Sequence, residues 1–391
     1  MARRTEMAAK HKNRLDQLTR IASGYADLIN LRPNWSNEHP LPRHVVDAAK
    51  DAVDRMHSYR FFGMRELRVA IAEKLERENG LKVDPETEML VTTGGSEAIY
   101  LAIWSMIDPG DQVIMGNPGY VAGYEPNVMM AGGRVVYVPT GEERKFKIDP
   151  EAVEKSITGK TKMIVIVSPE NPTGAIVDEG DLERIAEIAV THDLLVLSDE
   201  IFEKVVYDGR KNFSVGSLPS MEGRTLTVNG FAKGYNMPGY RVGYVAGPEP
   251  IIEKMANIQL HMTVSVSEIA QSAALAALQG PQGWIEEAVR AYGMRRDLFV
   301  DGLNRIGNMR CLKPEGGFAA FPNIAEFGIS SEDFSDYLLK EAHILSESGQ
   351  SFFGTRSEGY IKLSFTRPRE ILEEALRRIE AALNKLRLPR C

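Results

Sequence analysis

Short runs of apolar residues recur along the middle of the chain, and several are apolar without a break. Such runs are typical of strands that are buried on both faces of a sheet. The predicted strands are residues 89–93, 112–116, 134–139, 162–168, 193–199, 225–230 and 241–247. Helical segments lie between many of them, at 96–107, 178–193 and from Pro250 to about Leu278. This alternation predicts an α/β fold whose mostly parallel central sheet carries helices on both faces.

The two ends of the chain show a different pattern. Residues 1–20 are polar and helical in pattern, and residues 29–42 are predicted to be an irregular connector. Helices are predicted over 43–56 and over 64–79, the second ending at Gly80. From about Gly283 we expect long amphipathic helices, short strands at 316–324 and 360–365, and a final helix from Arg369. We therefore predict a large domain at 45–285 and a small α+β domain formed by 1–44 and 286–391.

Composition narrows the classes of function. With 391 residues the chain exceeds the size at which one core stops growing, which favours two domains. A formal net charge of -7 argues against nucleic acid as the main partner. The chain has two cysteines, Cys311 and Cys391, which are too few for a disulfide framework or a zinc cluster. We therefore expect no bound metal and a cytoplasmic location. We also expect no secretory signal and no transmembrane helix, because no long apolar run occurs.

Lys233 lies among small and apolar residues in the segment NGFAKGYNMPGYRVG, residues 229–243. Burying an ammonium group is costly, so such a lysine tends to become neutral or to find a partner. With Arg241 nearby, Lys233 is a candidate amine nucleophile toward a carbonyl cofactor. The alternative is a lysine that extends from a glycine-rich loop into solvent. This segment alone does not separate the two interpretations.

Other candidate residues follow the predicted strands, where open parallel sheets bind ligands. The strand at 89–93 ends in Gly94-Gly95-Ser96 and leads into a helix, whose free N–H groups suit a phosphate, although the turn alone is weak evidence. The strand at 162–168 ends in SPENPTG, a rigid turn that projects Asn171. Asp199 ends the strand at 193–199, where it points to a ligand or caps a helix.

Together, SPENPTG, the LSDEI segment and the K-x-x-x-M-P-G-Y-R-V-G block resemble the fold type I, pyridoxal-phosphate-dependent aminotransferases of class I/II, the aspartate-aminotransferase-like group. The resemblance runs from about residue 29 to the C-terminus. It implies a homodimer with shared active sites that binds pyridoxal 5'-phosphate. It also implies transfer of an amino group from a small-molecule amino donor to a 2-oxo acid acceptor, with Lys233 carrying the cofactor as a Schiff base.

The resemblance also implies a role for each site residue. Lys233 would hold the cofactor and act as general base, and Asp199 would pair with the pyridine nitrogen. The other cofactor-binding positions that it implies are Asn171 at the 3′ oxygen, Tyr120 at the ring face, Gly95, Ser96 and Arg241 at the phosphate, and Tyr59 at the phosphate of the neighbouring subunit. Ordinary core packing is the alternative for Tyr120. The local spacing around Tyr59 is one residue short of the family's.

Two departures concern the cofactor. The family usually has a tyrosine three residues after the aspartate, where this chain has Phe202. Serines that help to bind the phosphate are often found where this chain has Gly230 and Ala232. The phosphate would therefore depend more on Arg241, on Tyr59 and on the turn at 94–96.

Two further departures concern the substrate. Lys362 stands where the family places the arginine that binds the substrate α-carboxylate, and Asn171 also belongs to the predicted substrate site. The lysine ammonium is a compact point charge, and it lacks the planar pair of N–H donors with which an arginine guanidinium binds a carboxylate. Three alternatives stay open: Lys362 binds a carboxylate less rigidly, the substrate is no ordinary α-amino acid, or Arg356 or Arg367 replaces the arginine. The segment 31–37 also lacks the family's glycine, and Trp35 would narrow the entrance.

Aminotransferase activity is the leading hypothesis. The second is another reaction of the same cofactor on the same fold, by a lyase, a decarboxylase or an oxidase, because fold does not determine chemistry. The third is a regulatory protein that resembles an aminotransferase without catalysing the reaction.

Overall fold

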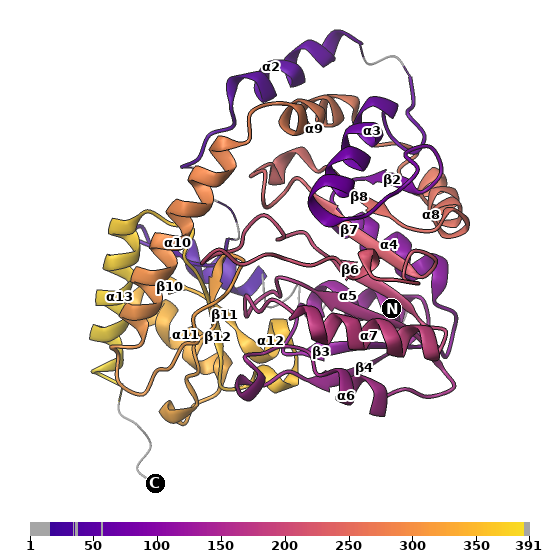
Figure 1. Cartoon of the computed structure of the whole chain (residues 1–391). Coiled ribbons are helices and arrows are strands. Elements are labelled where there is room, and N and C mark those ends of the chain that lie inside the picture. Colours follow the sequence, from indigo (N-terminus) through magenta and orange to yellow (C-terminus); the bar gives the residue numbers. More distant parts are fainter. Residues whose placement is uncertain (1–15, 34, 36–37, 56–57, 387–391) are drawn as a thin grey trace.

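The computed structural model describes residues 16–33, 35, 38–55 and 58–386. In this part of the chain the largest sheet has seven strands in the order β2-β8-β7-β6-β5-β3-β4 (Figure 1). β8 is antiparallel to its neighbours β2 and β7, and the other pairs are parallel. The strands are β2 (Met89–Thr92), β3 (Gln112–Asn117), β4 (Arg134–Pro139), β5 (Thr161–Val167), β6 (Leu195–Asp199), β7 (Thr225–Gly230) and β8 (Gly243–Ala246). The predicted α/β class and the predicted strands are confirmed.

Helices cover both faces of this sheet because its strands are apolar on both sides. Along β5, Ile164 and Ile166 belong to one buried cluster, which includes residues of α7. Val165 and Val167 belong to another, which includes residues of α4, α5 and α8. Successive strand residues point to opposite faces. A run without polar residues therefore places β5 in the middle of three layers.

The helices include three that were not predicted from the sequence, α5, α6 and α12, and one predicted helix is wrong. They are α2 (Arg43–Ala52), α3 (Arg65–Lys74), α4 (Gly95–Met106), α5 (Val121–Met130), α6 (Pro150–Lys155), α7 (Glu179–Thr191), α8 (Glu249–Met262), α9 (Glu268–Gln279), α10 (Gly283–Leu303), α11 (Ser331–Ala342), α12 (Gly349–Phe353) and α13 (Arg369–Leu383). The single helix predicted from Pro250 to Leu278 is wrong, because α8 ends at Met262 and α9 starts at Glu268. The break follows from Thr263 and Val264, β-branched residues of low helix propensity, and Val264 has φ 65°.

Small strands join distant parts of the chain beside the main sheet. β1 (Ile29–Asn30) pairs with β10 (Ile344–Leu345), and a second small sheet has the order β11 (Glu347–Ser348), β12 (Ile361–Ser364), β9 (Ala319–Ala320). The connector predicted at 29–42 therefore contains a strand, and the strand predicted at 316–324 is restricted to β9. Ile29 and Leu31 are buried, and their backbone N–H groups donate to the carbonyls of His343 and Leu345, more than 300 positions away.

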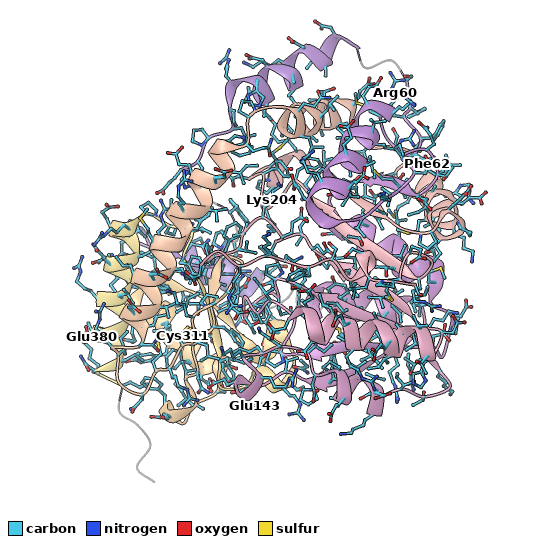
Figure 2. All side chains as sticks on the ribbon, in the orientation of Figure 1. Arg60, Phe62, Glu143, Lys204, Cys311 and Glu380 are labelled. Carbon is cyan, nitrogen blue, oxygen red and sulfur yellow. The ribbon has the colours of Figure 1, made fainter. Side chains whose placement is uncertain are left out.

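Helices α10, α11 and α13 pack around these small strands (Figure 1). We propose that this region is the small domain predicted at 1–44 and 286–391, with 45–285 as the large domain. Of the helix predicted at 1–20, residues 16–22 are helical and the rest lies outside the described residues. Cys311 is buried in this region (Figure 2), and Cys391 lies outside the described residues. Within the described ranges, no helix is long and apolar enough to cross a membrane.

Candidate active site

A cavity of ≈ 1050 Å³ lies at the carboxyl ends of the parallel strands. The large sheet contributes residues that follow β5, β6 and β7, and the small strands contribute residues from the other side. Its lining includes Asn30, Arg32, Trp35, Gly95, Ser96, Tyr120, Asn171, Asp199, Phe202, Ala232, Lys233, Arg241, Glu347, Phe352, Phe353 and Lys362. Except for Tyr59, the predicted site residues therefore meet at one cavity.

Lys233 follows β7 and reaches this cavity. Burial lowers the pKa of its amine from the ordinary 10.5 to about 8, and the positive charges of Lys362 and Arg241 act in the same direction. Asp199 and Glu347 oppose this shift. The Lys233 nitrogen lies 5.5 Å from the centre of the Phe202 ring. Near neutral pH the neutral fraction of this amine is far larger than that of an ordinary lysine, which favours Lys233 as an amine nucleophile.

Asp199 ends β6 and is buried. Its carboxylate accepts hydrogen bonds from the Tyr124 hydroxyl at 2.6 Å and from the Ile201 N–H at 3.1 Å. Burial raises the pKa of Asp199, and these two hydrogen bonds and Lys233 oppose the rise. A carboxylate held in this way suits a cationic ring nitrogen of a ligand in the cavity.

Sequence reasoning missed Tyr124, which lies in α5 four residues after Tyr120. It is fully buried, and its ring meets that of Tyr120 edge-on at 6.4 Å. Tyr120 itself precedes α5, lines the cavity and is 39% exposed, so it is not ordinary core. The spacing of four places both rings on one side of a helical turn. That spacing in NPGYVAGY is the signal that could have identified Tyr124.

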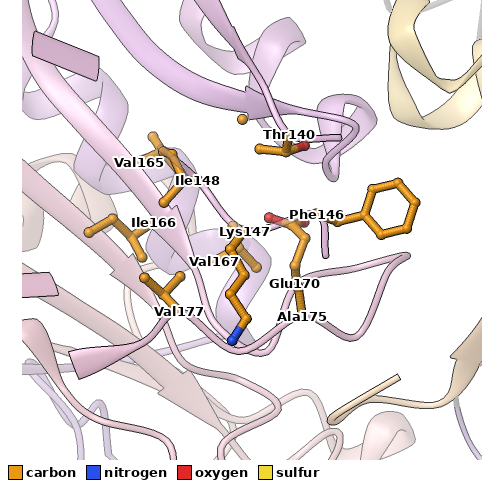
Figure 3. Close-up of a pocket in the computed structure, with 11 residues that line it drawn as sticks. Thr140, Phe146, Lys147, Ile148, Val165, Ile166, Val167, Glu170, Ala175 and Val177 are labelled. Carbon is orange, nitrogen blue, oxygen red and sulfur yellow. The ribbon is translucent and has the colours of Figure 1, made fainter. Parts of the chain in front are cut away.

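Glu170 is a second residue that the sequence did not single out. It lies next to Asn171, and one carboxylate oxygen accepts a hydrogen bond from the Tyr120 N–H at 3.3 Å. Its carboxyl group points into a small cavity of ≈ 20 Å³, while the Lys147 amine points away (Figure 3). That amine pairs with Asp178 at 2.7 Å. Burial raises the pKa of Glu170 well above its usual range, and Asp199 adds to the rise.

An anion-binding corner forms where α4 begins. The helix begins at Gly95, and its N-cap residue Gly94 has φ 75°. A Cβ on Gly94 would overlap the guanidinium of Arg241, and a Cβ on Gly243 would lie 2.5 Å from the Gly95 nitrogen. The two glycines therefore allow an arginine and a helix N-terminus with its free N–H groups to converge. This combination suits a phosphate.

The same close packing explains why residue 230 has no side chain. A Cβ on Gly230 would lie 2.8 Å from the Gly243 Cα and 3.0 Å from the Val242 carbonyl oxygen. β7 and β8 are paired at this point. A serine at 230 therefore does not fit this backbone, which gives a physical reason for the departure.

Tyr59 is the predicted site residue that the chain does not bring to the cavity. It is 70% exposed, and its ring lies 6.3 Å from that of Phe61. Its predicted role is at the site of a neighbouring subunit, and it stays a prediction.

The substrate side contains an ion-pair cluster that the sequence did not reveal. Glu347 on β11 is directly opposite Lys362 on β12, and their side chains form an ion pair at 2.7 Å. The Nε of Arg32 lies 3.4 Å from the same carboxylate, and the Lys362 amine donates to the Arg32 carbonyl at 3.2 Å. Neither Arg32 nor Glu347 belongs to a recognisable motif. Only the pairing of β11 with β12 brings the three residues together.

The two arginines predicted as alternatives to Lys362 are not among the cavity-lining residues. Arg356 is exposed, and its backbone N–H donates to the Asn117 side chain at 3.3 Å. The Nε of Arg367 donates to the Asn30 carbonyl at 2.9 Å. Trp35 lines the cavity and is 45% exposed, whereas Asn34, Ser36 and Asn37 of the predicted segment lie outside the described residues.

The family model for aminotransferases of class I and II matches residues 27–379. The chain belongs to this family. The aromatic-amino-acid aminotransferase 2 of Thermococcus litoralis is 38% identical over 99% of this chain and all of its own length. The aspartate aminotransferase of Pyrococcus abyssi shows the same identity and coverage. The structure of the Thermus thermophilus aspartate aminotransferase with maleate has a TM-score of 0.90 and 36% identity, and the match covers 98% of this chain and 99% of that one.

This membership confirms the predicted recognition and the leading hypothesis. The protein is an aminotransferase, an enzyme that moves an amino group between an amino acid and a 2-oxo acid. Its relatives are named aminotransferases over the full chain, which favours an enzyme over a regulatory protein. In this aminotransferase, Phe202 lies beside Lys233, Gly230 lies on β7 next to the cofactor corner, and Arg32, Glu347 and Lys362 form an ion-pair cluster.

Proposed function

We propose that this aminotransferase uses pyridoxal 5'-phosphate, held at the cavity by Lys233. The observation that carries the proposal is one cavity containing a desolvated amine at Lys233, a buried carboxylate at Asp199 and an anion corner at Arg241. These groups fit the aldehyde, the ring nitrogen and the phosphate of the cofactor. When bound, the cofactor supplies a carbonyl that condenses with amines and a ring that accepts electrons.

Each remaining residue has a role in this proposal. Lys233 moves the proton at the substrate Cα, because its pKa near 8 lets it act both as base and as acid near neutral pH. Asp199, held by Tyr124, keeps the ring nitrogen protonated. The other proposed contacts are Asn171 at the ring oxygen and, on the substrate side, at the amino acid, Tyr120 at the ring face, and Gly95 with Ser96 at the phosphate.

We also propose that the enzyme is a homodimer in which Tyr59 reaches the partner's site. The exposed ring of Tyr59 supports this arrangement, and sedimentation of wild-type protein tests it. The cytoplasmic location stays a prediction that cell fractionation would check.

For the amino donor we propose an amino acid with an aromatic or large apolar side chain. Trp35, Phe352 and Phe353 line the cavity on the substrate side. Apolar burial of such a side chain is favourable, and aromatic pairs add to it. The relatives include one named for aromatic amino acids and one named for aspartate, so both belong in the test.

A half-reaction separates the possibilities. Purified enzyme is mixed with L-phenylalanine or L-aspartate without a 2-oxo acid, and the absorbance of the cofactor is followed. We expect conversion to the amino form of the cofactor at lower concentrations of phenylalanine than of aspartate. Release of ammonia or carbon dioxide in place of this conversion would favour the lyase, oxidase or decarboxylase alternative.

The attachment site needs its own measurement. After borohydride reduction of the loaded enzyme, we expect peptide mass spectrometry to find the cofactor on Lys233. Lys233→Ala should lose it, whereas Lys254→Ala, at an exposed position on α8, should retain it. Cofactor found on another lysine would refute the assignment.

A further inference from the structure

The cavity has more positive charge than the proposed cofactor contacts use. Among its described lining residues, the cations are Arg32, Lys233, Arg241 and Lys362. Under the proposed function, Lys233 and Arg241 face the cofactor. Arg32 and Lys362 remain, and both contact Glu347. The cluster of these three residues carries a net charge of +1, which suits one carboxylate of a ligand.

The Lys362 side chain is held by contacts within the protein. It is only 3% exposed, and its amine is held by Glu347 at 2.7 Å and by the Arg32 carbonyl at 3.2 Å. Phe353 lies on another side, with its ring centre 5.9 Å from the amine. Drawing Lys362 toward a ligand would remove its ion pair with Glu347, whose side chain is 14% exposed. Breaking such a pair is costly, because the largely buried Glu347 carboxylate would keep only its longer contact with the Arg32 Nε.

Arg32 is the cation that remains available. Its contact with Glu347 uses Nε at 3.4 Å, and within the described ranges neither terminal nitrogen has a hydrogen-bond or ion-pair partner. The side chain is 17% exposed, and the guanidinium lies 6.0 Å from the centre of the Phe352 ring. A guanidinium offers a planar pair of donors, which is the geometry that a carboxylate accepts.

The surrounding contacts hold Arg32 in place. Its backbone N–H donates to the Asn30 side chain at 3.0 Å, and its carbonyl accepts from Lys362. Glu347 then draws Nε to one side, which leaves the two terminal nitrogens for a ligand. We propose that Arg32 binds the α-carboxylate of the amino-acid substrate and that Glu347 and Lys362 position Arg32. This assignment rests on the proposed function, and it moves the carboxylate-binding residue from β12 to the segment after β1.

The test uses 3-phenylpropionate, a carboxylate that lacks the amino group, and measures its Kd for the loaded enzyme by calorimetry. We expect Arg32→Gln to weaken binding roughly 10- to 100-fold, as for loss of charged hydrogen bonds. Arg32→Lys should fall between Arg32→Gln and wild type, because the charge stays and the fork is lost. Arg356→Gln, an exposed arginine outside the lining, is the matched control and should not change Kd.

Two more variants distinguish positioning from direct contact. In Lys362→Met, Glu347 keeps its ion pair with Arg32 but loses the one with Lys362. Glu347 should then hold the Arg32 guanidinium more strongly, so we expect weaker binding of 3-phenylpropionate. Adding Glu347→Gln to Lys362→Met should recover most of the lost affinity, because Arg32 is released. If Lys362 binds the carboxylate itself, the double variant stays as weak as Lys362→Met and Arg32→Gln binds normally. That pattern would overturn the assignment.

Circular dichroism and thermal unfolding check that each variant is folded. Failure of the proposed function would give a different result from failure of the Arg32 assignment. If the proposed function failed, the cofactor spectrum of the wild-type enzyme would not respond to any amino acid. A wild-type response, together with an Arg32→Gln variant that has unchanged KM for L-phenylalanine and unchanged Kd for 3-phenylpropionate, would refute only the role of Arg32.

Discussion

The lowered pKa of Lys233 predicts that the cofactor-free protein is destabilised by this lysine at neutral pH. The difference between 10.5 and about 8 corresponds to about 3 kcal/mol at ~1.36 kcal/mol per pKa unit. Below pH 8 the amine is protonated in both the folded and the unfolded chain, so the folded state bears the full cost of a desolvated charge. Above pH 10.5 the amine is neutral in both states, and the cost is absent. Stability should therefore rise with pH between these values.

Lys233→Met removes the charge at every pH. At pH 7 we expect the cofactor-free variant to be more stable than wild type by up to about 3 kcal/mol, and this advantage should shrink as the pH rises from 8 toward 10. The assay is urea unfolding of both proteins, without cofactor, at several pH values. Lys254→Met provides the control, because Lys254 is exposed on α8 and should leave the pH profile as in wild type. A stability difference between Lys233→Met and wild type that stays constant from pH 7 to 10 would refute the reasoning.

Three other predictions follow from the cofactor corner. Phe202→Tyr introduces a phenol beside Lys233, so the pH titration of the bound cofactor's absorbance should shift downward, and an unshifted titration would count against the role of this position. Arg241→Ala should cause a large loss of cofactor on dialysis, because at the proposed site the phosphate would depend on Arg241 where serines are missing; near-normal retention would contradict this. Gly230→Ser should lower the free energy of unfolding by about 1–3 kcal/mol, since its Cβ would lie 2.8 Å from the Gly243 Cα. Ala232→Ser is the control, and equal losses in the two variants would exclude this explanation.

Much of the large sheet could be predicted because its signals are local. The unbroken apolar run of β5 indicates a strand buried on both faces, and its burial confirms this. The break between α8 and α9 was missed, because the apolar residues on both sides suit one helix and only Thr263 and Val264 mark the interruption. β1 could not be found from a connector sequence, because it becomes a strand only through its pairing with β10.

The sequence by itself determined the family, the α/β fold and the positions of the candidate cofactor residues, because those signals lie in short contiguous motifs around Asn171, Asp199 and Lys233. The tertiary structure alone decided what surrounds them. Tyr124 reaches Asp199 across 75 positions, and Glu347 meets Lys362 through strand register and Arg32 from more than 300 positions away. Charges interact through space and not along the chain. The environment of Lys362, and with it the proposed role of Arg32, therefore follows only from the folded arrangement.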